Sequence, residues 1–195
     1  MGEFKGAIKG APKTFQKKVG ILGGSFNPPH LGHVAIARHV LDELFVDEVW
    51  VIPCFEHPFD KELAPFEERF KMCQLAFPSE EFGETVQVLD LEKKMGGKSY
   101  TLRTIQHLQK ENPDCTFSLI VGEDAADEAK SWHQYEELKK KVAWNIVPRG
   151  EGSPIPNVSA TEIRKAIQEG QNLENHLPTA VLGYLQKHPI YARHG

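Results

Sequence analysis

The sequence contains few of the residues that build covalent or metal frameworks. Its three cysteines, Cys54, Cys73 and Cys115, are scattered, and none belongs to a CxxC pair. This argues against a disulfide framework or a thiolate zinc site, and a reducing cytoplasm is expected. Apolar runs are also short. None approaches the ~20 residues that a membrane-spanning helix requires, and no signal peptide is expected before the first strand.

Excess positive charge is missing as well. The 195 residues carry a formal net charge of −4, which argues against a nucleic-acid-binding protein. The segment 1–18 is the exception, because it holds five lysines, one glutamate and three glycines. We expect a flexible basic tail there, with a nucleic-acid-binding arm as the alternative. The remaining 19–191, in a chain that is 40% hydrophobic, suits a single domain.

Two familiar phosphate-binding loops are absent. The letters GGKS at 96–99 look like the end of a Walker loop, but Glu92 stands where its first glycine should be. The glycines at 20, 23 and 24 do not have the G-x-G-x-x-G spacing of dinucleotide-binding folds. Any nucleotide must therefore be held in another way.

What the sequence does have is a regular alternation of strands and helices. Short apolar runs predict strands at 19–22, 49–52, 86–89, 117–121 and 143–147. Helical spacing predicts helices at 33–44, from Pro65 onward, at 100–110 and in a segment containing Trp132. Two further helices, from about 157, close the chain. This pattern predicts a doubly wound, Rossmann-like parallel sheet with helices on both faces and a small C-terminal helical part.

The stretch GGSFNPPHLGH at 23–33 joins the first predicted strand to the first predicted helix. In parallel sheets, ligands bind at the carboxyl ends of the strands, where the strand order reverses. His30 and His33 would lie near the amino end of the helix, which favours anions. Gly23 and Gly24 would let the backbone approach a phosphate. A rigid turn with two surface histidines is the alternative, and a zinc site lacks an apparent third ligand.

A second candidate anion site lies at the start of the first C-terminal helix. Ser159 and Thr161 place two hydroxyls there, and Arg164 follows about one turn later. Arginine is suited to bidentate phosphate contacts. The alternative is an ordinary capped helix, because Ser159 and Glu162 form an S-x-x-E capping box.

Two more stretches suggest contacts to a nucleoside. Gly122, Glu123 and Asp124 follow a buried strand, so a carboxylate there could accept hydrogen bonds from ribose hydroxyls or serve as a helix N-cap. Trp132 could stack on a flat ring, with the Ser99-Tyr100-Thr101 stretch beside a helix start as a further contact, although a tryptophan in such a position can also be a core residue.

Taken together, these stretches resemble the HxGH nucleotidyltransferases, and within them the bacterial nicotinate (or nicotinamide) mononucleotide adenylyltransferases. The resemblance rests on GGSFNPPHLGH at 23–33, VWVIP at 49–53, SYT at 99–101, GED at 122–124, Trp132, VSATEIR at 158–164 and LPTAVLGYLQKHPIY at 177–191. It runs from about Val19 to Tyr191. It implies adenylyl transfer from ATP, with Mg²⁺ accompanying the ATP, to the mononucleotide, and a cytoplasmic enzyme of NAD biosynthesis.

The same resemblance implies roles for individual residues. His30 and His33 would be catalytic and hold the ATP phosphates. The other ATP-binding residues would be Gly23, Gly24, Ser25, Phe26, Gly122, Asp124, Ser159, Thr161 and Arg164. The mononucleotide would be bound by Lys61, Ser99, Tyr100, Thr101 and Trp132. No protein-held metal, nucleic acid or membrane is implied, and a homo-oligomer stays open.

The sequence departs from the family pattern on the acceptor side. Arg103 stands at an acidic position of the usual S-Y-T-x-D-T, and EHPFDK at 56–61 replaces a P-P-H-K or P-P-H-R stretch, leaving Lys61 as the candidate phosphate contact. These changes leave the choice between nicotinate and nicotinamide open, with nicotinate preferred. The rival interpretations are an HxGH transferase with another phosphate acceptor, and a nucleotide-binding sensor without turnover.

Overall fold

A computed structural model describes residues 16–44, 46–148 and 152–192. Its centre is a five-stranded sheet in the order β3-β2-β1-β4-β5, in which every neighbouring pair is parallel. The strands are β1 (Lys17–Gly24), β2 (Glu48–Pro53), β3 (Val86–Val88), β4 (Cys115–Gly122) and β5 (Ala143–Val147). The chain runs outward from β1 to β3, returns to β4 beside β1, and continues to β5. The strand order therefore reverses between β1 and β4.

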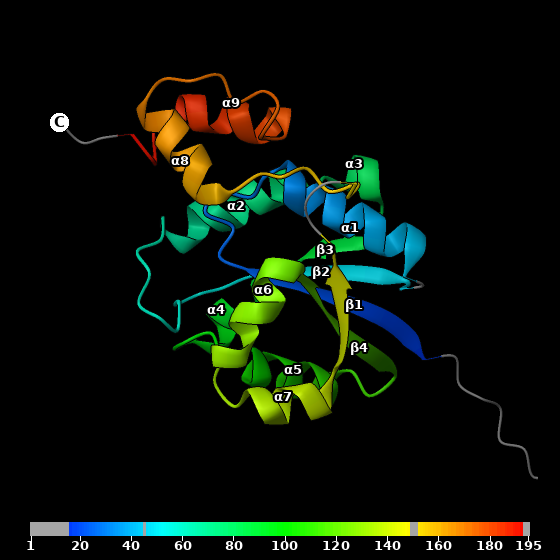
Figure 1. Ribbon diagram of the computed structural model, residues 1–195. Helices are drawn as coiled ribbons and strands as arrows, with labels where there is room; N and C mark the ends of the chain where they lie inside the picture. The colour runs from blue at the N-terminus through cyan, green and yellow to red at the C-terminus, as the bar shows by residue number, and fades with distance from the viewer. Residues whose placement is uncertain (1–15, 45, 149–151, 193–195) are drawn as a thin grey trace, which may run out of the picture.

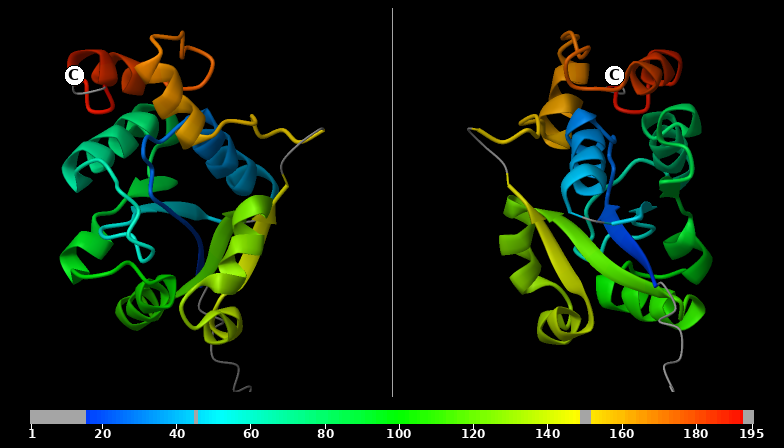
Figure 2. Two further views of the ribbon diagram at one scale, coloured as in Figure 1. Left: turned by 60° about the vertical axis from the view of Figure 1, so that its left-hand side comes forward. Right: turned by 90° about the vertical axis from the view of Figure 1, so that its right-hand side faces the viewer.

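Helices cover both faces of this sheet (Figures 1 and 2). The face with α1, α2, α8 and α9 carries one apolar cluster, and the face with α5 and α7 carries the other. The helices are α1 (Leu31–Glu43), α2 (Phe66–Ala76), α3 (Ser79–Phe82), α4 (Leu91–Met95), α5 (Thr101–Glu111), α6 (Glu123–Glu128), the 3₁₀ helix η1 (Ala129–Ser131), α7 (Tyr135–Lys141), α8 (Ala160–Gln168) and α9 (Thr179–Lys187). The predicted doubly wound parallel architecture is confirmed.

Alternate residues of β1 explain the two layers. Ile21 packs in the cluster beneath α5, whereas Leu22 packs in the cluster beneath α1. Both side chains are buried because β1 lies at the centre of the sheet with helices on each side. A strand buried on both faces needs a continuous apolar run, which is the pattern by which the sequence predicted it.

Several boundaries differ from the prediction. β1 begins at Lys17, inside the segment 1–18 predicted as a tail, because Lys17 pairs with Cys115 of β4 and its ammonium contacts Glu48 at 2.5 Å. Residues 1–15 lie outside the described part of the chain. Trp132 is not in a helix: it follows η1, with an extended backbone, before α7 begins. The short helices α3 and α4 were not predicted, since four or five residues carry too little periodicity.

The C-terminal helices are packed onto the domain through α2 and the loop after β1. Ser159 caps α8 as predicted, its hydroxyl oxygen accepting a hydrogen bond from the Glu162 amide at 3.4 Å. Helix α9 lies against α2, and the Tyr184 hydroxyl of α9 donates to the Glu68 carboxylate of α2 at 2.8 Å. In Figure 2, α8 and α9 form a layer outside α1 and α2.

Helix α2 also contributes a fully buried cation. Arg69 is 1% exposed, and its guanidinium donates to the carbonyl oxygens of Ala64 and Ser25, both at 2.8 Å, and of Phe55 at 3.4 Å. These three carbonyls belong to the loops that follow β1 and β2. A single side chain therefore joins α2 to both loops.

Replacing Arg69 by Met should destabilise the fold, because it removes every donor to these buried carbonyls while keeping most of the volume. We expect a loss of about 2–5 kcal/mol of unfolding free energy, measured by urea titration. Arg38→Met is the matched control, since the Arg38 side chain is 57% exposed and pairs with Glu81 at the surface. It should cost less than about 1 kcal/mol. Equal losses in the two variants would contradict the role given to Arg69.

Candidate active site

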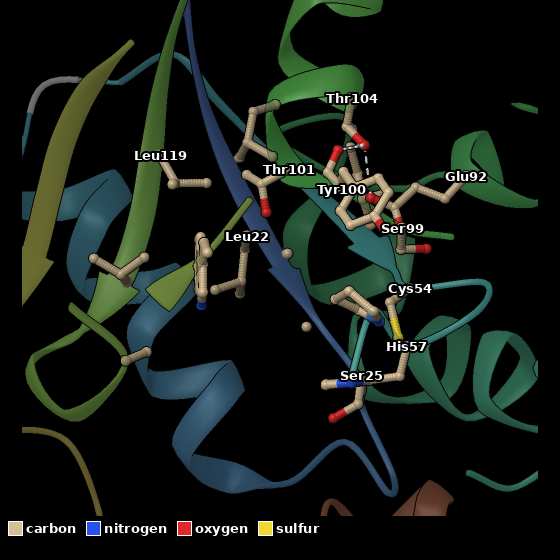
Figure 3. Close-up of a pocket in the computed structure, with 18 of the residues that line it drawn as sticks. Leu22, Ser25, Cys54, His57, Glu92, Ser99, Tyr100, Thr101, Thr104 and Leu119 are labelled. Carbon is tan, nitrogen blue, oxygen red and sulfur yellow. Dashed lines mark hydrogen bonds between the residues drawn. The ribbon is translucent and has the colours of Figure 1, made fainter. Parts of the chain in front are cut away.

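A cavity of about 320 Å³ opens at the carboxyl ends of β1, β2 and β4, where the strand order reverses (Figure 3). Its apolar floor includes Leu22 and Leu119, and its polar wall includes Ser25, Ser99 and Thr101. Ten residues predicted as site residues line it: Gly23, Gly24, Ser25, Lys61, His33, Ser99, Tyr100, Thr101, Gly122 and Trp132. Segments that are far apart in the sequence thus meet at the switch point.

Five of the other predicted residues do not line this cavity. Phe26 and His30 are 1% and 3% exposed and lie behind the wall formed by His33. Ser159, Thr161 and Arg164 lie at the start of α8, beside the loop after β1. Asp124 lies in the first turn of α6, and its side chain is outside the described part of the structure. Apart from Phe26 in the core and Asp124, the ATP-binding residues predicted from the sequence therefore fall into a cavity group and an α8 group.

The loop from Ser25 to His30 has an unusual backbone. Phe26 has φ +45°, in the left-handed region, and the Asn27–Pro28 peptide bond is cis. For a bulky residue the left-handed conformation costs roughly 1–3 kcal/mol, so surrounding contacts must hold it. The Phe26 ring is packed in the core, and Arg69 binds the Ser25 carbonyl next to it. Tertiary contacts thus impose the shape of this loop.

The two histidines stand at the start of α1, as predicted. His30 is the N-cap residue, and its backbone N–H donates to Nδ1 of His33 at 3.2 Å. Because Nδ1 accepts this bond, a neutral His33 ring carries its hydrogen on Nε2. The two ring centroids lie 3.8 Å apart, with 33° between the ring planes. His33 can therefore act as a donor at the cavity wall.

Gly32 allows this packing. A Cβ atom at this position would lie 3.0 Å from Nδ1 of His30 and 3.4 Å from the Pro156 carbonyl oxygen. Any side chain would displace the His30 ring. The glycine between the histidines is therefore a packing requirement.

The electrostatics at the start of α1 favour an anion. The first turn of the helix contains no acidic residue, and the amino end of a helix carries a partial positive charge. Arg164 adds a cation nearby, donating to the Asn27 carbonyl oxygen at 2.7 Å and to the Thr161 hydroxyl at 3.2 Å. The amino end of α1, the His33 imidazole and the Arg164 guanidinium thus all lie on or next to the loop after β1.

Aromatic rings form the opposite side of the cavity. Tyr100 packs against His133, with ring centroids 4.4 Å apart, and half-buried Trp132 packs against Trp144 at 6.2 Å. Thr101, at the first position of α5, follows Tyr100 and lines the same cavity. A planar ligand entering here would meet an apolar platform with hydroxyl groups beside it.

Two loops at the cavity mouth are bound to each other. The Phe55 amide donates to the Ser99 hydroxyl oxygen at 2.8 Å, and the Ser99 amide donates to the Glu56 carbonyl oxygen at 2.9 Å. Lys98 pairs with Asp60 at 2.9 Å. The loop that carries exposed Lys61 is therefore fixed to the turn that precedes α5.

The sequence reasoning missed several residues that line the cavity, among them Glu92, His57 and Cys54. Burial is the main cause that raises the pKa of Glu92, whose Oε1 accepts a hydrogen bond from the Thr104 hydroxyl at 2.7 Å. Burial, followed by Lys61 and Arg69, lowers the pKa of His57, so this ring is neutral at pH 7. Cys54 lies beside His57 in Figure 3. Isolated residues of these types carry no spacing signal.

Arg103, the departure at an acidic family position, is turned away from this site. Its guanidinium donates to the Gly96 carbonyl oxygen at 2.5 Å and to the Met95 carbonyl oxygen at 2.7 Å. These carbonyls end α4, so Arg103 satisfies acceptors that a helix C-terminus leaves open. It is not among the residues that line the cavity.

Neither a metal cluster nor a spanning helix was found in the described ranges. Among residues 16–44, 46–148 and 152–192, no group of three or more His, Cys, Asp or Glu side chains could hold a metal ion. Within the same ranges, no helix is both long and apolar enough to cross a membrane.

Comparison with known proteins shows which sequences this chain is similar to. The family model described as cytidylyltransferase-like matches residues 21–166. A probable nicotinate-nucleotide adenylyltransferase of Anaeromyxobacter dehalogenans (strain 2CP-C) is 35% identical over 184 residues, covering 90% of this chain and 97% of that protein. A probable nicotinate-nucleotide adenylyltransferase of Myxococcus xanthus (strain DK1622) is 35% identical over 181 residues, covering 89% of this chain and 94% of that protein.

A solved structure supports the fold. The Plasmodium falciparum nicotinic acid mononucleotide adenylyltransferase complexed with NaAD aligns with a TM-score of 0.76 at 21% identity, over 90% of this chain and 97% of that one. At this identity the likeness concerns the architecture alone.

The thiol of Cys54 should be unreactive although it borders the cavity. Burial is the main cause that raises its pKa to about 11. Roughly 0.1% is then thiolate at pH 8. We expect iodoacetamide to label Cys115, which is half-buried, well before Cys54, as measured by mass spectrometry of tryptic peptides. Labelling of Cys54 at the same rate would contradict the buried environment.

Proposed function

The chain belongs to the nicotinate-nucleotide adenylyltransferases, within the cytidylyltransferase-like family, and we propose that the cavity at the β1–β4 switch point is its active site. It transfers the adenylyl group of ATP to nicotinate mononucleotide, a step of NAD biosynthesis. We take the chain from Lys17, where β1 begins, to Tyr191 as one catalytic domain, to which the C-terminal helices from about 157 belong. The observation that carries this assignment is the position of Gly24, Ser25 and His33 on the wall of a cavity of about 320 Å³ at the switch point of the sheet.

The reaction needs no nucleophile from the protein. An oxygen of the mononucleotide 5′-phosphate attacks the α-phosphorus of ATP, and a new P–O bond forms. The bond from the α-phosphorus to the bridging oxygen breaks, and its electron pair leaves with pyrophosphate. The attacking phosphate is already anionic, so no proton has to be removed first. Catalysis then consists of positioning the two substrates and stabilising negative charge.

The loop after β1 supplies this stabilisation. We assign Nε2–H of His33 and the backbone of Gly24 and Ser25 to the triphosphate of ATP. His30 fixes the His33 ring through its backbone N–H and adjoining ring. Donors that are already oriented strengthen as charge builds on the phosphate oxygens in the transition state.

The remaining ATP contacts are assigned to the neighbouring strand end and to α8. Gly122 lies at the end of β4 on the cavity wall and would meet the adenosine together with Asp124. Ser159, Thr161 and Arg164 would bind the departing pyrophosphate, because Arg164 contacts both Thr161 and the Asn27 carbonyl oxygen of the loop after β1. A guanidinium binds phosphate oxygens in a fixed, paired geometry.

Nicotinate mononucleotide is assigned to the aromatic side of the cavity. Trp132 offers a platform for the pyridine ring, and Thr101 and the Ser99–Tyr100 turn provide polar contacts around it. Lys61 lies at the mouth, where it can attract the phosphate group.

Mg²⁺ enters as part of the substrate. We assign the ion to the phosphate oxygens of ATP, which are the hard oxygen ligands that Mg²⁺ prefers.

The direct test is a pyrophosphate-release assay with Mg-ATP and either nicotinate or nicotinamide mononucleotide. Turnover with nicotinate mononucleotide is expected, and its absence would refute the function. Sugar phosphates and phosphopantetheine in place of the mononucleotide test the rival acceptors, and a protein that binds ATP without any turnover would be a sensor.

The role of His33 is tested in the same assay. His33→Ala should lower kcat by about 10²–10³, the usual cost of one transition-state donor, with little change in the KM for the mononucleotide. The matched control is His39→Ala, because His39 lies on the same helix and does not line the cavity. Comparable losses in both variants would show that the effect comes from helix stability.

Trp132→Ala should weaken binding of the mononucleotide by removing the stacking platform. We expect its KM to rise about tenfold, since stacking on an aromatic side chain contributes roughly 1–3 kcal/mol per base. The KM for ATP should stay within a factor of about two. Trp132→Phe keeps a ring and should lie between Trp132→Ala and wild type. An unchanged acceptor KM in Trp132→Ala would exclude the stacking role.

A further inference from the structure

The Ser25–His30 loop, which leads into the start of α1, is hydrogen-bonded to the C-terminal part of the chain. Asn27, only 4% exposed, is the point of attachment. Its side-chain oxygen accepts hydrogen bonds from the Tyr191 hydroxyl at 2.8 Å and from the Ala64 amide at 3.1 Å. Its backbone oxygen accepts from Arg164 at 2.7 Å. Two of these three donors belong to the C-terminal part.

A further contact holds the other end of the loop. The amide of Leu31, the first residue of α1, donates to the carbonyl oxygen of His176 at 3.0 Å. His176 lies in the connection between α8 and α9. The C-terminal part therefore binds the chain on both sides of His30, at Asn27 and at Leu31.

Tyr191 is suited to a permanent bond of this kind. Its side chain is 8% exposed and packs in the cluster that also contains Phe26. Burial is the main cause that raises its pKa, so the hydroxyl remains a donor across the pH range in which enzymes work. It does not line the cavity and cannot contact a ligand there.

We propose that the Tyr191–Asn27 hydrogen bond positions the loop, and that Tyr191 is a positioning residue for His30 and His33. The inference rests on the proposed function. The loop contains a left-handed residue, Phe26, and so does not keep its shape without outside contacts. Arg69 holds it at Ser25, and Tyr191 holds it two residues later, next to the prolines that precede His30.

The chain supplies a matched control in Tyr184. Its hydroxyl also joins the C-terminal part to the domain, donating to Glu68 at 2.8 Å, but Glu68 lies on α2 and not on the loop. Tyr191→Phe and Tyr184→Phe each remove one hydroxyl and leave the ring in place. In Tyr191→Phe the Asn27 oxygen still accepts from Ala64, so no buried acceptor is left without a partner.

The test compares both variants with the wild-type protein in kcat, in the KM of each substrate and in Tm. In Tyr191→Phe, kcat should fall about tenfold through misplacement of the histidines. The KM for ATP should rise, and the KM for nicotinate mononucleotide should stay within a factor of about two. Tyr184→Phe should keep wild-type kinetics. Both variants should lose similar amounts of Tm, because each loses one hydrogen bond.

A second measurement does not depend on activity. In ¹³C-histidine-labelled protein without substrates, the imidazole resonances of His30 and His33 should shift in Tyr191→Phe and stay unchanged in Tyr184→Phe. Unshifted resonances, or equal kinetics in the two variants beside an active wild type, would overturn the positioning role. A wild-type protein that makes no dinucleotide would refute the proposed function instead, and the resonances would still decide the role of Tyr191.

Discussion

The guanidinium of Arg69 is the contact on which the site most depends. It lies between the loops that follow β1 and β2 and donates to a carbonyl oxygen of each, as well as to Ala64 next to its own helix. Loops at the end of a parallel sheet expose carbonyls that no strand can satisfy. A guanidinium spreads five N–H donors over a fixed plane and can reach carbonyl oxygens on several sides, whereas a lysine has all its donors on one nitrogen. The two sides of the cavity are thereby joined through one side chain.

A fully buried positive charge is unfavourable by itself, and the carbonyl dipoles around Arg69 offset only part of that cost. Its field also reaches the cavity, because it contributes to the lowered pKa of His57. A polyphosphate bound at the proposed site would offset part of the remaining charge. The cation that shapes the loops and the anion that the loops receive would then stabilise each other.

The sequence predicted the features that depend on local pattern. The apolar runs identified β4 and β5, and the HxGH spacing located both histidines at the start of α1. The sequence did not predict which contacts hold the Ser25–His30 loop in place. Arg69 and Ser25 are 44 residues apart, and Tyr191 and Asn27 are 164 apart, so no local spacing links them. Arg103 is a second example of a long-range feature that the local motif does not predict. Its position in a family motif suggested that it lies on the side of the site that binds the phosphate acceptor, whereas its guanidinium binds carbonyl oxygens at the end of α4.

The contact between Asn27 and Tyr191 can form only late in the synthesis of the chain. During synthesis, β1 and its histidine loop are among the first segments made, whereas Arg164 and Tyr191 are among the last. A nascent chain can pair its strands well before these two donors exist. The sheet can thus form before the active site is complete. A chain still on the ribosome would then have the parallel sheet without the contacts that Arg164 and Tyr191 make to Asn27.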